Sequence, residues 1–211
     1  MRVFLAFPLP AEVLGYIERM QAYLRHRSVR GKWISPESSH LTVLFLGDQE
    51  EMRVQRLAEA CGRRCVELPP IRFRTGTMTT FGRPARVLVF ELADEPPGAF
   101  ASVVNAVAEC AKAEDLDLPP SALRAEPRPH LTLARFRDGR ETRTLENVGA
   151  LRDGAWQWHK PVPPPPAGAD TFVCSELLLF KSTLTTDGPI YDELARFPMG
   201  QGRAAGPGSS G

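Results

Sequence analysis

The sequence contains one short pattern twice, and the repeated residue types can carry out acid–base chemistry. The tripeptide His-Leu-Thr occupies residues 40–42 and recurs at residues 130–132, each time followed by apolar residues. Imidazole titrates near neutral pH, so two such groups can divide the roles of general acid and general base. Two threonine hydroxyls can donate hydrogen bonds to phosphoryl oxygens without adding charge. The pair predicts phosphoryl chemistry that requires neither a nucleophilic side chain nor a metal.

Strand geometry explains why this spacing matters. Side chains at positions i and i+2 of a strand project from the same face, so His40 shares a face with Thr42, and His130 with Thr132. The leucine between them then points to the opposite face and can pack in the core. If the two halves of the chain approach about a pseudo-two-fold axis, all four side chains line one cleft. We therefore predict that His40 and His130 are catalytic and that Thr42 and Thr132 bind the substrate.

Two simpler interpretations stand beside this one. A histidine at the start of a strand is often structural, and threonine is an ordinary strand former. Either motif alone would support that interpretation, whereas their recurrence favours a function. Two histidines could also ligate a metal, but no Asp, Glu or third His recurs beside them at ligand spacing. We predict neither a metal nor a cofactor, and we assign no role to His26 or His159, which lack the pattern.

The composition excludes several classes of protein. The 211 residues carry 26 Lys and Arg against 25 Asp and Glu, and 43% are hydrophobic, which is ordinary for a globular protein. Proteins that coat long nucleic acids or anionic membranes usually carry a larger positive excess. The four cysteines form no C-x-x-C pair, which is typical of free thiols in a reducing compartment. No signal peptide or membrane span is recognisable, so we expect a cytoplasmic protein, and we expect a monomer.

Hydrophobic periodicity predicts an α+β domain with mostly antiparallel strands. We expect strands at residues 2–7, 41–46, 71–77, 85–92, from 130 onward and at 172–180, and helices at 11–27, 50–68 and 100–116, with a short helix or turn at 141–151. Residues 1–198 should form one domain. Residues 199–211 are rich in Gly and Pro, and we expect them to be a flexible tail.

The motifs also carry a family resemblance. The two His-x-Thr segments resemble the paired HxTx signatures of the 2H phosphoesterases. More closely, the chain resembles the RNA 2',3'-cyclic phosphodiesterases, a group once called 2'-5' RNA ligases. The blocks that carry this similarity lie at residues 2–6, 40–47, 129–135, 177–182 and 188–191, in order along residues 2–198.

The resemblance implies a bilobal fold, with two pseudo-symmetric lobes of mostly antiparallel sheets that each give one His-x-Thr strand to a central cleft. In this family one histidine is the general base on water, or on an incoming 5'-hydroxyl in the ligation direction. The other protonates the departing ribose oxygen, which leaves a 2'-phosphate. The threonines hold phosphate oxygens, and Arg135, which follows the second motif, is expected to contact the phosphate. Strict alternation puts Arg135 on the face opposite His130, unless the strand ends or bulges near Ala134.

The expected partners are RNA ends or nucleotides that carry a 2',3'-cyclic phosphate. Phe81 lies near the expected rim of the cleft, where its ring could stack on a base, although it could equally be a core aromatic residue. Two other functions stay open at this point: a small-molecule cyclic nucleotide phosphodiesterase, and a module that binds RNA or nucleotides without turnover. The sequence does not decide which histidine is the base and which is the acid.

Overall fold

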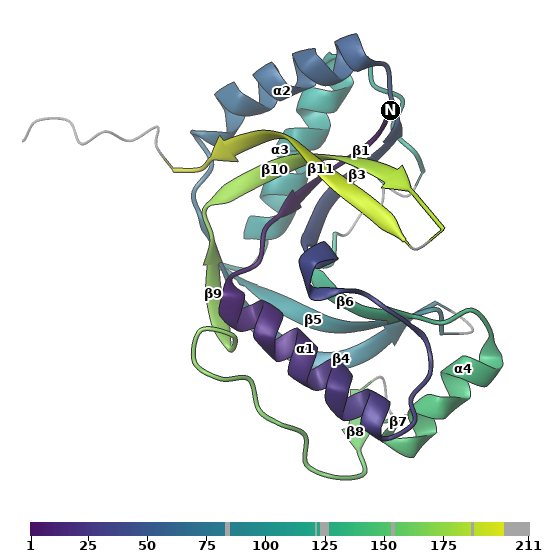
Figure 1. Cartoon of the computed structure of the whole chain (residues 1–211). Helices are drawn as coiled ribbons and strands as arrows, with labels where there is room; N and C mark the ends of the chain where they lie inside the picture. Colours follow the sequence, from purple (N-terminus) through teal and green to yellow (C-terminus); the bar gives the residue numbers. More distant parts are fainter. Residues whose placement is uncertain (83–84, 121, 123–126, 153–154, 187, 201–211) are drawn as a thin grey trace, which may run out of the picture.

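The computed structural model describes residues 1–82, 85–120, 122, 127–152, 155–186 and 188–200. Within them the chain folds into two larger sheets with helices on their outer faces (Figure 1). All strand pairs that the structure describes are antiparallel. The predicted α+β class with antiparallel pairing is therefore confirmed.

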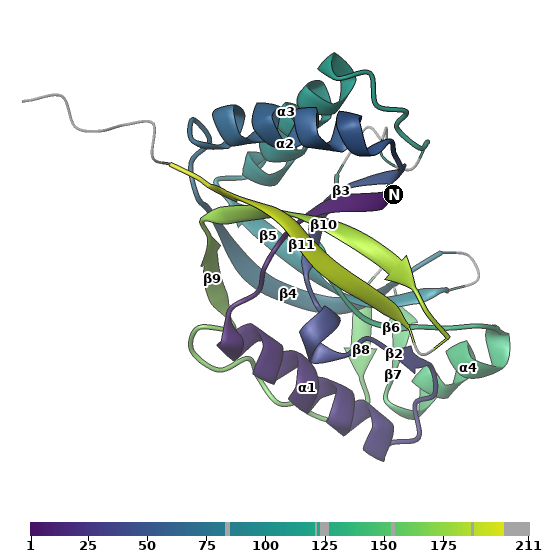
Figure 2. The same cartoon turned by 45° about the horizontal axis from the view of Figure 1, so that its top comes forward.

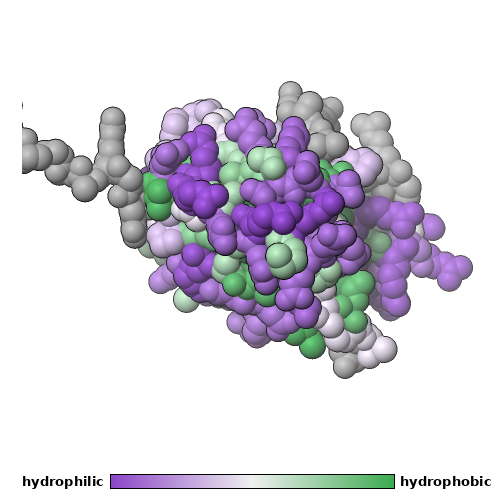
Figure 3. Space-filling view, turned by 90° about the horizontal axis from the view of Figure 1, so that it is seen from above, coloured by the Kyte–Doolittle hydropathy of each residue, from purple (hydrophilic) through white to green (hydrophobic). Residues whose placement is uncertain are grey.

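Sheet A forms the upper half of the molecule in Figure 1. Its strand order is β11 (Pro189–Pro198), β10 (Glu176–Leu184), β1 (Arg2–Phe7) and β3 (Leu41–Asp48). Helices α2 (Glu51–Cys65) and α3 (Ala99–Ala113) lie above this sheet. Their apolar residues recur at helical spacing and are buried, whereas the outer surface seen from above is mostly hydrophilic (Figure 3).

Sheet B forms the lower half. Its order is β2 (Lys32–Trp33), β6 (His130–Arg135), β5 (Val87–Glu95), β4 (Ile71–Phe81) and β9 (Thr171–Cys174). Helix α1 (Ala11–His26) covers its outer face, where the ring of Tyr16 stacks on Phe90 at 5.3 Å. The remaining elements are η1 (Pro36–Ser38), α4 (Gly139–Arg143), η2 (Thr144–Asn147) and a hairpin of β7 (Gly149–Arg152) and β8 (Ala155–Trp158).

Both sheets lie between the helices, as the two views agree (Figures 1 and 2). The two strands that carry the motifs, β3 and β6, belong to different sheets and contact each other. The buried faces of sheets A and B join one hydrophobic cluster, which includes Phe7 of sheet A and Phe73 of sheet B at 6.1 Å. The fold thus brings two segments that are far apart in the sequence to the same place.

The prediction of one strand over residues 172–180 is wrong. The structure has two strands, β9 in sheet B and β10 in sheet A, separated at Ser175. Apolar residues lie on both sides of the break, at 172–174 and at 177–180, so the segment resembles one strand with only Ser175 and Glu176 between its two apolar parts. The edge strand β11 and the β7–β8 hairpin were not predicted. Most residues of β11 are exposed or half-buried, so its hydrophobic pattern is weak.

The first residue of the predicted flexible tail, Met199, is part of the folded domain. Met199 is buried, and its N–H donates to the carbonyl of Ser175 at 2.8 Å. Residues 201–211, most of the predicted tail, lie outside the described residues. In the part of the chain that the structure describes, none of the helices has the length and apolar character that crossing a membrane requires.

Candidate active site

The two motif histidines are held in the same way. His40 immediately precedes β3, and His130 is the first residue of β6. The Nδ1 atom of each ring lies at hydrogen-bond distance from the backbone carbonyl two residues earlier, 2.9 Å from Ser38 O and 2.7 Å from Arg128 O. Because a carbonyl can only accept, each Nδ1 carries a proton. In the neutral rings Nε2 is then the atom that can take up a proton.

Strand β6 contains a bulge directly after its motif. Thr132 pairs with Val89 while Ala134 pairs with Leu88, so Leu133 has no partner on β5. A bulge shifts the alternation of the side chains. His130, Thr132 and Arg135 consequently pair with positions 91, 89 and 87 of β5, which share one face. Strict alternation would place Arg135 on the face opposite His130, unless the strand bulged or ended near Ala134. The structure contains a bulge, with Leu133 as the extra residue, and Arg135 lies on the same face as His130.

Strand β3 has a bulge at the equivalent position. Thr42 pairs with Ala6 of β1, and Leu44 pairs with Leu5, which leaves Val43 without a partner. After this bulge Phe45 pairs with Phe4, so it lies on the face of Thr42. Phe45 follows His40 by the same number of residues as Arg135 follows His130. The two halves therefore repeat the motif, its bulge and the next position on the same face.

Two buried glutamines support bulges in these strands, and sequence reasoning missed both. Gln21 of α1 donates from Nε2 to the carbonyl of Leu133 at 3.0 Å, and to that of Ile34 at 2.7 Å. In the other half, Gln49 donates to the carbonyl of Leu46, where β3 has a second register shift, at 2.6 Å. The only sequence signal for Gln21 is a polar residue on the apolar stripe of a helix. Such a residue is buried only when a partner satisfies it.

Aromatic rings surround His40. The ring centroid of Phe4 lies 4.8 Å away, that of Tyr191 5.2 Å away in an edge-on contact, and that of Phe180 6.4 Å away. Burial lowers the pKa of His40 to about 4, the hydrogen bond to the Ser38 carbonyl opposes this shift, and the charge of Arg135 adds to it. In the free protein at neutral pH, His40 is uncharged.

His130 has more polar surroundings. The ring of Phe81 meets it edge-on at 5.0 Å, and the guanidinium of Arg128 lies 5.4 Å from the centroid of that phenyl ring. Burial lowers the pKa of His130, and the charges of Arg135 and Arg128 lower it further, while the bond to the Arg128 carbonyl and the Glu91 carboxylate oppose the shift. Glu91 is in turn paired with Arg128 at 2.7 Å.

The structure brings the predicted residues of both halves to one place. The charge of Arg135 lowers the pKa of both motif histidines and of Tyr191, so its exposed guanidinium lies within electrostatic reach of all three. The ring of Phe81, which was predicted to bind the substrate, lies beside His130. Tyr191 was not predicted as a site residue, because its strand was not recognised. The charge of Arg135 therefore acts on groups of both sheets.

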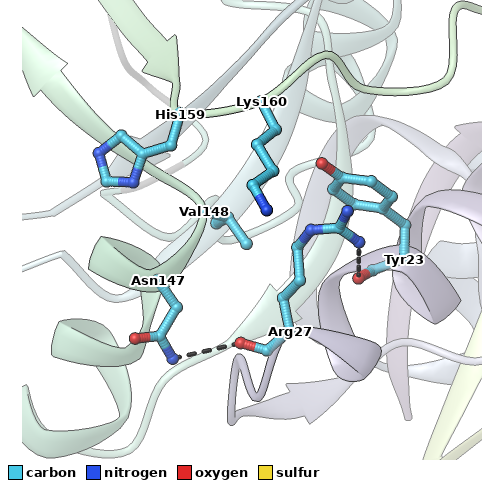
Figure 4. Close-up of a pocket in the computed structure, with 6 residues that line it drawn as sticks. All are labelled: Tyr23, Arg27, Asn147, Val148, His159 and Lys160. Atoms are coloured by element: carbon cyan, nitrogen blue, oxygen red, sulfur yellow. Dashed lines mark hydrogen bonds between the residues drawn. The ribbon is translucent and has the colours of Figure 1, made fainter.

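Two hollows lie on the surface of sheet B and its neighbours. One of about 490 Å³ adjoins His130 and is lined by residues that include Gly76, Thr77, Glu91 and Arg128. A smaller one of about 120 Å³ lies at the end of α1 and is lined by Tyr23, Arg27, Asn147, Val148, His159 and Lys160 (Figure 4). Neither motif histidine is among the residues that line these two hollows, and His159 stays without an assigned role.

Among the residues that the structure describes, no group of three or more His, Cys, Asp or Glu side chains is arranged to hold a metal ion. The four cysteines are free thiols, of which Cys61, Cys65 and Cys174 are buried. Burial raises the pKa of the Cys174 thiol to about 12, which keeps it protonated and unreactive.

Comparison with known proteins agrees with this geometry. Residues 7–89, which contain the first motif, match the family model of the LigT-like phosphoesterases. The chain also aligns over nearly its whole length with curated proteins named RNA 2',3'-cyclic phosphodiesterase. The chain is similar to proteins of the 2H phosphoesterase family.

Two of these relatives are archaeal. The protein of Methanothermobacter thermautotrophicus is 25% identical over 201 residues, which cover 94% of this chain and 98% of the relative. That of Methanocaldococcus jannaschii is 26% identical over 194 residues, or 91% of this chain and 97% of the relative. Both alignments span both motif segments of the chain.

Solved structures share the fold of this chain. A crystal structure of the Thermus thermophilus protein TT0787 superposes with a TM-score of 0.69 at 25% identity, covering 96% of this chain and all of that one (100%). The apo form of E. coli LigT superposes with a TM-score of 0.66 at 21% identity, covering 94% of this chain and 96% of LigT. The predicted bilobal 2H phosphoesterase fold is thereby confirmed.

Proposed function

We propose that this protein hydrolyses the 2',3'-cyclic phosphodiester ends of RNA to 2'-phosphomonoesters. The observation that carries the proposal is the pair of motif histidines, which come from two sheets and have Nδ1 bonded to a carbonyl and Nε2 available for a proton. The guanidinium of Arg135 acts electrostatically on both rings. The names of the curated relatives support a cyclic phosphodiester of RNA as the substrate.

The reaction divides naturally between the two rings. One Nε2 takes a proton from water as the water oxygen forms a bond to phosphorus. The other ring, protonated, gives its proton to the ribose 3'-oxygen as the bond from phosphorus to that oxygen breaks. Each such group contributes about 10²–10⁴ in rate. With a 5'-hydroxyl in place of water as the attacking group, the same side chains would join two RNA ends through a 2'-5' linkage.

Charge develops on the non-bridging phosphate oxygens during this reaction. The hydroxyls of Thr42 and Thr132 and the guanidinium of Arg135 are the donors that we assign to those oxygens. The two-residue spacing places each threonine on the face of its motif histidine, and the bulge at Leu133 places Arg135 on the face of His130. Acid, base and charge stabilisation are thus all supplied by side chains. We therefore propose that catalysis does not depend on a metal ion.

A short RNA ending in a 2',3'-cyclic phosphate tests this function, with EDTA present throughout. We expect the protein to open the ring to a 2'-phosphate, identified by ³¹P NMR of the product, and His40→Ala and His130→Ala to abolish the reaction. His159→Ala is the matched control and should retain it. Loss of activity in EDTA would overturn metal independence.

Two other outcomes correspond to the alternative functions. Opening of nucleoside 2',3'-cyclic phosphates with no opening of RNA ends would favour a small-molecule cyclic phosphodiesterase. Binding of both ligands with no turnover of either would favour a binding module. The second outcome is not expected, because binding alone has no need of two titratable rings with available Nε2 atoms.

A further inference from the structure

A second arginine lies on the same face of sheet A as the contacts of His40. Side chains of β1 alternate, so Arg2 shares a face with Phe4, whose ring touches His40. The guanidinium carbon of Arg2 lies 4.8 Å from the ring centroid of Phe45. Phe45 is the counterpart of Arg135 in the repeat. In the second half of the repeat, Arg135 itself supplies a guanidinium at this position. In the first half the position is occupied by Phe45, and the guanidinium of Arg2 stacks on its ring.

Neither of these two arginines forms an ion pair in the part of the chain that the structure describes, although Asp48 is the cross-strand neighbour of Arg2. The arginines that form ion pairs there are Arg53, Arg56, Arg64, Arg74, Arg128, Arg137 and Arg196. Stacking on Phe45 restricts the Arg2 side chain without neutralising its charge. A positioned guanidinium that faces a phosphate site and lacks a carboxylate partner is suited to a second phosphate group.

Tyr191 connects the two arginines. Its ring meets His40 edge-on at 5.2 Å and Phe4 at 5.0 Å. Burial raises the pKa of Tyr191, and the charges of Arg135 and Arg2 both lower it. Both guanidinium groups therefore interact electrostatically with the Tyr191 hydroxyl. The charge of Arg135 also acts on both histidines, whereas that of Arg2 contributes to neither shift. Arg2 reaches the surroundings of His40 through Phe45 and the cross-strand neighbour of Phe45, Phe4, whose ring contacts His40.

We propose that Arg2 and the hydroxyl of Tyr191 form a second phosphate subsite, which holds the phosphodiester on the 5' side of the terminal nucleotide. The inference rests on the proposed function and deepens it. The preferred substrate is then the end of an oligonucleotide rather than a free nucleoside cyclic phosphate, because only the oligonucleotide has a second phosphate to occupy the subsite.

The test compares kcat/KM for a nucleoside 2',3'-cyclic phosphate with kcat/KM for a dinucleotide that has the same cyclic end. The wild-type ratio should favour the dinucleotide. Arg2→Gln should reduce this ratio by about ten- to a hundredfold, the value of a hydrogen bond to a charged group, and Tyr191→Phe by about two- to tenfold. Arg63→Gln, which removes an exposed arginine of α2, is the matched control and should leave the ratio unchanged. An unaltered ratio in Arg2→Gln, or an equal loss on both substrates, would overturn the proposal.

A binding measurement separates this proposal from the proposed function. Calorimetry would compare a nucleoside 2'-phosphate with a dinucleotide ending in a 2'-phosphate, for wild type and Arg2→Gln. If the wild type opens neither cyclic phosphate, the proposed function is wrong, and the ratio of the two dissociation constants still decides the subsite. Thermal unfolding checks that Arg2→Gln is folded. Arg2→Lys, which keeps the charge without the planar guanidinium, should restore part of the preference.

Discussion

The two motif segments share their construction and differ in their surroundings. Each has a histidine whose Nδ1 bonds to the carbonyl two residues earlier, and each has a bulge directly after the threonine. His40 is packed against Phe4, Phe180 and Tyr191, whereas His130 meets one ring, Phe81. Charged groups also act on His130, among them Arg128 and Glu91, which form an ion pair.

This difference shows how a repeated scaffold can hold two unlike groups. In both segments the hydrogen bond from Nδ1 to a backbone carbonyl orients the imidazole ring and leaves Nε2 available for a proton. The surroundings then set the proton affinity, which for His40 is reduced by burial among aromatic rings to a pKa of about 4. Burial also lowers the pKa of His130, and the charges of Arg135 and Arg128 add to this shift, while the hydrogen bond to the Arg128 carbonyl and the carboxylate of Glu91 oppose it. Two interacting groups titrate as a pair, so acid and base roles belong to the pair until they are measured separately.

Removing either ring should have the largest effect on activity. His40→Gln and His130→Gln should each lower kcat by about 10²–10⁴, the contribution of one general acid or base. The double variant should lose little beyond the worse single variant, because both rings act in one step. Single-turnover opening of a cyclic phosphate end measures all three. If the factor by which the double variant lowers kcat equals the product of the factors for the two single variants, the two rings act independently. That result would contradict their action as an acid–base pair in one step.

Arg135 is the next test, since it acts on both rings. Arg135→Gln should lower kcat/KM by about 10²–10³, the cost of losing one donor to a developing oxyanion. The charge of Arg135 lowers the pKa of both histidines, so its removal should also move both limbs of the pH profile of kcat/KM to higher pH. Arg140→Gln, on the exposed surface of α4, is the control. A shift of only one limb would show that Arg135 serves one half of the site.

The pH dependence of stability should separate the two rings. The pKa of His40 is lowered from 6.5 to about 4, so the folded protein binds fewer protons there than the unfolded chain. Its contribution to the free energy of unfolding is therefore complete above pH 6.5 and is lost as the pH falls toward 4. Urea unfolding at pH 7 and pH 5 should show a smaller decrease for His40→Gln than for wild type. An equal decrease in both would contradict the buried, neutral state of this ring.

The smallest expected effect concerns the glutamines that support the bulges. Gln21→Met leaves the carbonyl of the bulge residue Leu133 without one of its donors, and Gln49→Met does the same for Leu46. Each should destabilise the fold by about 1–3 kcal/mol, the cost of an unsatisfied buried group. Urea unfolding measures this change. Gln21→Met should also lower the activity, because its bulge sets the direction of Arg135, and stability loss with full activity would argue against that link.

Much of the fold could be predicted from the sequence, because strand β1, helix α1 and the motif strands have clear periodic patterns and sharp ends. The motif residues could be found because their spacing matches the two-residue repeat of a strand. Arg135 was placed on the correct face only by the structure. A bulge depends on the register with a neighbouring strand, and no local pattern in β6 records it.

Arg2 and Tyr191 illustrate what stays hidden for a related reason. Arg2 opens an apolar strand as a single charged residue, and Tyr191 lies on an edge strand whose residues are mostly exposed or half-buried. Their significance comes from neighbours on other strands, Phe45 for Arg2 and His40 for Tyr191. Such neighbours are set by the tertiary structure, which a single sequence without an alignment does not reveal.

The central claim is that both repeats face one phosphate, and histidine NMR tests it most directly. Two-dimensional ¹H–¹⁵N spectra of the imidazole rings would be recorded while a nucleoside 2'-phosphate is added. We predict that both rings begin neutral with the proton on Nδ1, and that the Nε2 signals of His40 and His130 shift together along one binding curve with one ligand per chain. A response of only one ring, or two separate binding curves, would contradict the shared site.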